Sequence, residues 1–87
     1  MKEIILTDNF KKSFKKRLTN IQQEKFFKKL ELFNQNHFHP SLRFHKLNGT
    51  LEDQCSISIE ENLRVILIED YNSIILIDIG THDQVYR

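Results

Sequence analysis

Cysteine, proline, glycine and tryptophan are all scarce in this chain of 87 residues, which holds one Cys, one Pro, two Gly and no Trp. The single cysteine, Cys55, excludes an internal disulfide and favours a reducing compartment. So little glycine and proline, together with 39% hydrophobic and 29% charged residues, excludes a disordered or repetitive chain. The composition is that of a globular protein.

Long hydrophobic runs are also absent. No apolar run approaches the roughly 20 residues that a membrane span needs. The N-terminal stretch MKEIILTDNF turns polar after three apolar positions, which is too short a core for a signal peptide. The length leaves room for one domain, residues 1–87. We therefore expect a soluble, cytoplasmic, single-domain protein.

Charge is unevenly distributed, although the net charge is only +1. Residues 1–50 hold eleven Lys or Arg against four Asp or Glu, a net +7, and residues 51–87 hold two against eight, a net −6. A basic half of this kind can meet an anion such as RNA while the overall charge stays modest.

Two amphipathic helices are expected in the basic half, after a short strand over 3–7. The first helix spans about 9–18, with an N-cap at Asp8 or Asn9. The second begins after a cap at Thr19 or Asn20, with a glutamine three residues on as in a capping box. It runs to about Phe33. Their apolar stripes are Phe10, Phe14 and Leu18 in the first and Phe26, Phe27, Leu30 and Phe33 in the second.

After Pro40 the hydrophobic period changes from about four to two, which predicts strands over 42–47, 54–60, 63–69 and 74–79. Asn48-Gly49 is a strong turn signal. The segment LRVILIE, 63–69, is apolar on both faces, as in a central strand. The order β-α-α-β-β-β-β predicts an α+β domain: the last four strands form an antiparallel meander, the helical hairpin packs on one face, and the first strand pairs at an edge or beside the last strand.

The alternation of apolar and polar residues predicts which side chains lie on the same face of each strand. In 54–60, Cys55 lies in phase with the apolar residues, so we expect it in the core, whereas Ser56 and Ser58 fall on a polar face. In 42–47, Arg43 and His45 share one face. Neither serine lies in a Gly-framed elbow, so a serine hydrolase is not expected.

Polar side chains of catalytic type gather at the end of the chain, in IILIDIGTHDQVYR. This ending is either a frayed polar tail or part of an active site. Earlier, Arg64 interrupts an apolar strand, and because an unpaired buried charge is costly, it faces a cleft or pairs with an acid. His37 and His39 form an H-x-H pair without cysteines or close acids, which is a weak metal signal, so no metal site is expected.

Four landmarks together resemble the RelE/ParE superfamily of bacterial toxins, most closely its YafQ-like branch. The first is the basic helical hairpin after a short strand. The others are His45-Lys46-Leu47-Asn48-Gly49, similar to an "H-x-L-x-G" turn; Leu63-Arg64-Val65-Ile66, in the place of a "YRVIY"-type strand; and Ile79-Gly80-Thr81-His82-Asp83-Gln84-Val85-Tyr86, close to "IGTHDEVY". The likeness spans almost the whole chain.

The resemblance implies a RelE-like fold and a toxin of a type II toxin–antitoxin system. Such toxins are mRNA interferases, endoribonucleases that cleave messages on translating ribosomes without metal or cofactor, because the RNA 2′-hydroxyl attacks the adjacent phosphate. The partners implied are a cognate antitoxin, the ribosome and mRNA. ParE-type relatives keep the fold but inhibit DNA gyrase by binding, so the fold alone does not determine the activity.

The resemblance also assigns site residues. His82 matches the catalytic histidine as general acid, and His45 matches a second active-site histidine that acts as base or holds the phosphate. Arg64 matches an arginine that contacts the phosphate. The alternative for each histidine is an ordinary surface position. RNA contacts are expected from Tyr86, Lys46, Arg43, Arg87, Lys11 and Lys15, where the alternative for the helix lysines is a solvated face.

The chain departs from the YafQ-like pattern in places. Ser58 occupies the place of a further histidine and Asn62 that of an aspartate, and neither is a usable acid or base near neutral pH. Leu51 lies near the place of a missing aromatic residue. Three hypotheses follow: a nuclease that works with His45, Arg64 and His82, a ParE-like inhibitor, or a decayed toxin that only binds antitoxin.

Overall fold

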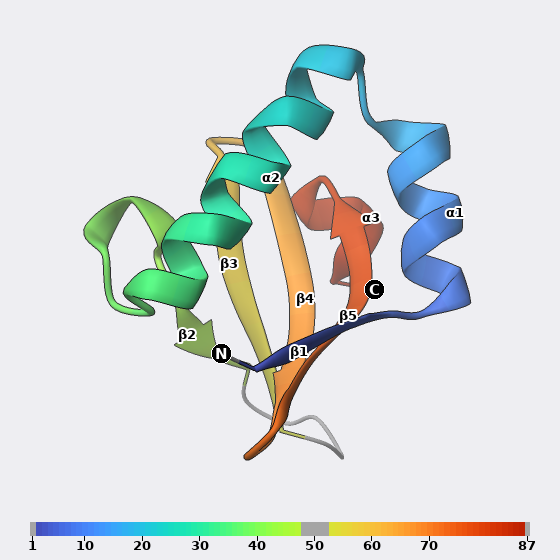
Figure 1. The fold of residues 1–87 in the computed structure, drawn as a ribbon. Coiled ribbons are helices and arrows are strands. Elements are labelled where there is room, and N and C mark those ends of the chain that lie inside the picture. Colours follow the sequence, from blue (N-terminus) through green and yellow to red (C-terminus); the bar gives the residue numbers. More distant parts are fainter. Residues whose placement is uncertain (1, 48–52, 87) are drawn as a thin grey trace.

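The computed structural model describes residues 2–47 and 53–86, which form an α+β fold with helices packed on a five-stranded sheet (Figure 1). The α+β class and the order of the main elements are as predicted. The elements are β1 (Glu3–Leu6), α1 (Asp8–Arg17), α2 (Asn20–Gln35), a 3-10 helix (Pro40–Leu42), β2 (His45–Lys46), β3 (Gln54–Glu60), β4 (Leu63–Glu69), β5 (Ser73–Gly80) and α3 (His82–Val85). The predicted turn at Asn48-Gly49 lies outside the described residues.

The strands lie in the order β1-β5-β4-β3-β2. Strands β2 to β5 form the predicted antiparallel meander, with β4 at the centre. Strand β1 lies at the edge beside β5, as expected, but the two strands run parallel, so the sheet is mixed rather than wholly antiparallel. A parallel pair is possible because β1 reaches the meander through two helices and not through a tight turn.

The core lies between the helical hairpin and one face of the sheet. Phe10, Phe26 and Phe33 of the hairpin are buried, and the ring centroids of Phe10 and Phe26 are 5.4 Å apart. Cys55 is a core residue, as predicted, and burial raises the pKa of its thiol. Phe27 differs from the prediction, because it is 60% exposed; it follows Phe26 by about 100° around the helix, which turns it away from the sheet.

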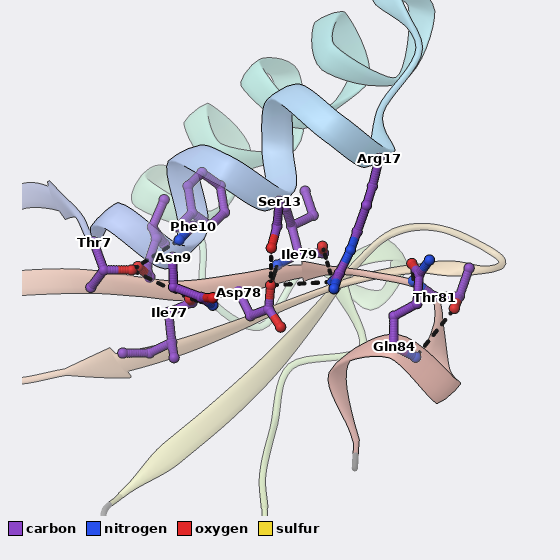
Figure 2. Close-up of polar contacts among 11 residues, drawn as sticks. Thr7, Asn9, Phe10, Ser13, Arg17, Ile77, Asp78, Ile79, Thr81 and Gln84 are labelled. Atoms are coloured by element: carbon purple, nitrogen blue, oxygen red, sulfur yellow. Dashed lines mark hydrogen bonds and ion pairs between the residues drawn. The ribbon is translucent and has the colours of Figure 1, made fainter.

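The N-cap of α1 is Thr7, not the predicted Asp8 or Asn9. The Thr7 hydroxyl oxygen accepts from the Phe10 N–H at 3.1 Å (Figure 2). The same hydroxyl donates to the Leu76 carbonyl of β5 at 2.8 Å. Strand β1 ends at Leu6, so Thr7 keeps the extended backbone that a cap requires. The cap therefore joins α1 to the last strand.

The second helix begins as predicted, at a capping box. The Thr19 side chain accepts from the Gln22 N–H at 3.2 Å, and the Gln22 side chain accepts from the Thr19 N–H at 3.0 Å. The helix continues two residues beyond Phe33, to Gln35. None of the helices in residues 2–47 and 53–86 is long and apolar enough to cross a membrane.

Strand β5 contains one extra residue where it pairs with β4. Leu67 pairs with Leu76 and Ile66 with Asp78, so Ile77 has no partner in the register. This bulge keeps Leu76 and Ile79, three positions apart, both in the core. The Ile77 carbonyl accepts from the Asn9 side chain of α1 at 2.8 Å (Figure 2).

The predicted strand over 42–47 is mostly wrong. Only His45 and Lys46 form β2, because Pro40–Leu42 is a 3-10 helix and Arg43 has a left-handed backbone with φ 48°. His39 caps this helix by accepting from the Ser41 N–H at 3.2 Å. Arg43 therefore does not share a strand face with His45.

Candidate active site

One open cleft, of about 380 Å³, brings together His45, Leu47, Arg64, His82 and Tyr86. These residues come from β2 and its end, from β4, and from α3 and the position after it. All three residues predicted to be catalytic line the cleft, and so does Tyr86. The four were separated by up to 41 positions in the sequence, so the fold has assembled them.

The cleft lies on the face of the sheet opposite the hairpin. Cys55 and Ile57 of β3 point into the core, so the intervening Ser56 points to the other face. The Tyr86 hydroxyl donates to Ser56 Oγ at 2.6 Å, which places the C-terminal segment on that face. Ser56 is fully buried there, which corrects the expectation of a polar surface position.

The short helix α3 carries His82 into the cleft. Thr81 caps it: its side chain accepts from the Gln84 N–H at 3.3 Å, and the Gln84 side chain accepts from the Thr81 N–H at 2.9 Å (Figure 2). This capping box is readable in the sequence as Thr-x-x-Gln, so the signal for α3 was present. The helix was missed because it is only four residues long.

Gly80 is required before α3 for reasons of space. A Cβ at this position would lie 2.6 Å from Gln84 Oε1 and 2.8 Å from Arg17 Nη1. The backbone of Gly80 is not left-handed, so the residue serves close packing and not an unusual turn. Gly80 also pairs with Arg64 across the β4–β5 ladder, which brings α3 next to the arginine.

His82 is accessible in the cleft, with 68% of its side chain exposed. Its ring centroid lies 4.5 Å from that of Tyr86. Its Nδ1 lies 3.6 Å from the carboxylate of Asp83, a fully exposed residue that offers only a weak, solvent-screened attraction to a protonated ring. The imidazole is therefore free to reach a ligand in the cleft.

His45 is held in one orientation by the main chain. Its Nδ1 lies 2.9 Å from the Arg43 carbonyl oxygen. A carbonyl can only accept, so Nδ1 carries the proton that it donates. In the neutral ring the lone pair is then on Nε2, which makes that atom the proton acceptor of this histidine.

Arg64 faces the cleft, and no acid in the described part of the chain pairs with it, which favours the first of the two predicted alternatives. Its Nη1 donates to Ser58 Oγ at 2.6 Å and to the Glu60 carbonyl at 3.4 Å. Across residues 2–47 and 53–86, no carboxylate forms an ion pair with it. The half-buried guanidinium is thus positioned by neutral acceptors and keeps its charge for an anion.

Ser58 and Asn62, the two residues that depart from the family pattern, lie in different parts of the structure. Ser58 is buried and holds Arg64, as just described, while donating to the Glu60 carbonyl at 2.9 Å. Asn62 is exposed at the β3–β4 turn and lines a second groove instead of the cleft. Ser58 therefore serves the site by positioning, a role that the sequence analysis missed.

None of the other predicted RNA-binding residues in the described chain lines the cleft. Lys46 follows His45 in β2, so its side chain points to the opposite face of the strand. Arg43, Lys11 and Lys15 are exposed, the first before β2 and the others on α1. Arg87 lies outside the described residues. For these positions, RNA binding stays a prediction.

The remaining histidines have structural contacts. His37 stacks on Phe33, with ring centroids 4.0 Å apart, and its Nε2 contacts the Glu69 carboxylate. His39 caps the 3-10 helix. Within the described ranges there is no cluster of three or more His, Cys, Asp or Glu residues that could hold a metal ion.

The model of one protein family matches almost the whole chain. This family is described as "Bacterial toxin of type II toxin-antitoxin system, YafQ", and the match covers residues 2–87. No curated protein sequence matches significantly.

Solved structures with the same fold include several toxins. A metal-bound toxin from Helicobacter pylori has a TM-score of 0.81 at 21% identity, covering 98% of this chain and 99% of that one. The E. coli DinJ-YafQ complex has a TM-score of 0.77 at 17% identity, covering 100% of both chains. An archaeal RelE-RelB complex from Pyrococcus horikoshii OT3 has a TM-score of 0.75 at 14% identity, covering 97% and 98%.

At these identities the structural neighbours establish the RelE-like fold, and the family model establishes the lineage. The chain therefore belongs to the YafQ family of toxins of type II toxin–antitoxin systems.

Proposed function

We propose that the protein is an mRNA interferase that cleaves messages on translating ribosomes by metal-free attack of a ribose 2′-hydroxyl. The observation that carries the proposal is the convergence of His45, Arg64 and His82 in one open cleft. Two histidines supply a proton acceptor and a proton donor that work near neutral pH, and an arginine supplies a fixed positive charge.

We assign each group a role that its position in the cleft supports. Nε2 of His45 accepts the proton of the 2′-hydroxyl, whose oxygen attacks the adjacent phosphorus. The bond from phosphorus to the 5′-oxygen breaks, and His82 donates a proton to that leaving oxygen. The products are a 2′,3′-cyclic phosphate and a 5′-hydroxyl. Arg64 stabilises the negative charge that builds on the phosphoryl oxygens, and Tyr86 supports His82 and contacts the nucleotide.

The partner that controls this activity is proposed to be a cognate antitoxin. Solved structures with the same fold include the E. coli DinJ-YafQ toxin-antitoxin complex and an archaeal RelE-RelB complex. A toxin that acts on translating ribosomes must work in the cytoplasm, the location expected from the sequence.

A translation reaction with intact ribosomes tests the proposal. The parent protein should cut messages at discrete positions, and His82→Ala should lower the cleavage rate by about 10²-fold or more. His39→Asn is a matched control, because it removes a histidine outside the cleft while keeping a side chain that can cap the 3-10 helix. Intact messages together with blocked DNA supercoiling would contradict the nuclease and favour gyrase inhibition.

A further inference from the structure

We propose that a second groove beside the cleft binds a nucleotide that flanks the scissile phosphate. This inference rests on the proposed function. The groove has a volume of about 580 Å³ and is lined by polar side chains from α1, α2, the β3–β4 turn and α3. The residues that carry the argument are Lys16, Arg17, Gln22, Glu60, Asn62 and Gln84.

The groove and the cleft share their dividing wall. Within α3, His82 lines the cleft and Gln84 lines the groove. At the start of β4, Leu63 lines the groove, and the next residue, Arg64, lines the cleft. An RNA strand that leaves the catalytic cleft across α3 therefore enters the groove.

A guanidinium is already ordered in the groove. Arg17 Nη1 donates to Asp78 Oδ1 at 3.3 Å and to the Ile79 carbonyl at 3.1 Å, and Ser13 in turn donates to the same carboxylate oxygen at 2.6 Å (Figure 2). Only 24% of the Arg17 side chain is exposed. Within residues 2–47 and 53–86 all of these bonds use Nη1, which leaves the Nη2 and Nε donors for a ligand. Preorganisation lowers the entropy cost of binding.

The second cation of the groove is Lys16. It is exposed at the end of α1, and no acid within residues 2–47 and 53–86 forms an ion pair with it. Lys16 supplies the positive charge for one backbone phosphate, and Arg17, whose charge is shared with Asp78, adds N–H donors beside it.

The rest of the groove fits a base or ribose better than a second anion. The Glu60 carboxylate accepts from the Gln22 side chain at 2.7 Å and from Lys25 at 2.9 Å, and these hydrogen bonds lower its pKa. Glu60 therefore stays charged and acts as an acceptor. The amide groups of Asn62 and Gln84 add further donors and acceptors. Such a combination can form hydrogen bonds with the edge of a base.

A length series of RNA tests the inference by NMR. The probe is an RNA whose attacking 2′-hydroxyl is replaced by hydrogen, so that the parent protein binds it without cleavage. A dinucleotide that spans the scissile bond should shift the ring signals of His82 and Tyr86 alone. Oligonucleotides longer by one to three nucleotides should also shift the side-chain amides of Asn62 and Gln84.

The outcomes separate the two proposals. Long RNA that shifts the cleft but never the groove overturns the groove alone. RNA that shifts neither set also overturns the groove, whereas the proposed nuclease is judged by message cleavage on intact ribosomes. Inorganic phosphate that moves the groove amides as much as long RNA does would also overturn the inference, because the groove would then be a simple anion site.

A pair of matched variants gives an independent test. Lys16→Glu and Lys12→Glu make the same change of charge on exposed residues of the same helix, but only Lys16 lines the groove. We expect Lys16→Glu to raise the dissociation constant of the long RNA about tenfold more than Lys12→Glu does, and to leave that of the dinucleotide nearly equal in the two variants. Equal effects on the long RNA would show general electrostatics and contradict the groove.

Discussion

Single residues of the candidate site are held by neighbours that have no chemistry of their own. Ser58 holds Arg64 at 2.6 Å, the Arg43 carbonyl holds His45 at 2.9 Å, and Ser56 holds Tyr86 at 2.6 Å. These contacts preorganise the cleft without placing a competing carboxylate in it. Because serine and backbone acceptors are neutral, the positive charge of the arginine remains available to a phosphate.

The hydrogen bond between Tyr86 and Ser56 yields a prediction at this scale. Tyr86→Phe keeps the ring beside His82 but leaves the fully buried Ser56 hydroxyl without this partner. We expect the free energy of unfolding to fall by about 1 kcal/mol. Urea denaturation of Tyr86→Phe, Ser56→Ala and the double variant should give a coupling energy of about 1 kcal/mol. Additive effects of the two single variants would show that the pair is not coupled.

Site residues were predictable from the sequence to different degrees. The three predicted catalytic residues, His45, Arg64 and His82, lie on three different elements. Composition and sequence spacing do not show how far apart β2, β4 and α3 lie in space, so only the resemblance to a family could have grouped these residues. The supporting serines could not be found in this way. A serine in an alternating strand has the same pattern whether it faces water or, as here, another chain segment.

At the scale of elements, α3 depends on the packing of Gly80 between two flexible side chains. Arg17 comes from the end of α1 and Gln84 from α3 itself, and both have their terminal atoms within 3 Å of where a Cβ would lie. The ends of both side chains already form hydrogen bonds. Gln84 Oε1 accepts from the Thr81 N–H, and Arg17 Nη1 donates to the Ile79 carbonyl of β5 (Figure 2). A methyl group at residue 80 must displace one of them.

We therefore predict that Gly80→Ala loosens α3 more than the rest of the fold. The amides of Val85 and Tyr86, which donate to the Thr81 and His82 carbonyls at 3.1 and 3.0 Å, should lose hydrogen-exchange protection by about tenfold. Amides of β4 should be unchanged. Gln84→Glu is the control, because a glutamate at this place keeps the capping box. Unchanged protection in Gly80→Ala would mean that both side chains move aside without cost.

The elements were predicted well where local signals are strong. The capping box at Thr19 and the alternation in β3 located α2 and β3 closely. The prediction failed for β2, because Pro40 and the cap at His39 favour a 3-10 helix that the hydrophobic period conceals. The parallel pairing of β1 with β5 depends on tertiary contacts, so the sequence pattern of neither strand could predict its direction.

At the scale of the whole molecule, the charge asymmetry of the sequence is partly internal complementarity. Three acids of the second half contact cations of the first half: Glu60 with Lys25, Glu69 with Lys2, and Asp78 with Arg17. These contacts hold the hairpin and β1 to the meander. The lysines of α1 that have no such partner among the described residues are the ones for which RNA binding stays a prediction.

One of these three acids is Glu69, at the end of β4. Its carboxylate contacts Lys2 Nζ at 3.0 Å and also His37 Nε2, so it joins β1, the segment after α2 and the sheet. Burial raises the pKa of this carboxyl, but the hydrogen bonds from His37 and Lys2 outweigh burial, and the net pKa lies below its ordinary value of 4.5.

A lowered pKa in the folded state determines the sign of a pH effect. The stabilisation is present above the ordinary value and is lost as pH falls through the folded pKa.

Glu69→Gln should therefore lower the free energy of unfolding by about 1 kcal/mol at pH 7, and the difference from the parent should shrink as the pH falls below about 4.5. The measurement is urea denaturation across pH 3 to 7, with Glu61→Gln as control because Glu61 is exposed at the β3–β4 turn. A difference that stays constant with pH would show that Glu69 stabilises the fold by packing and not by its charge.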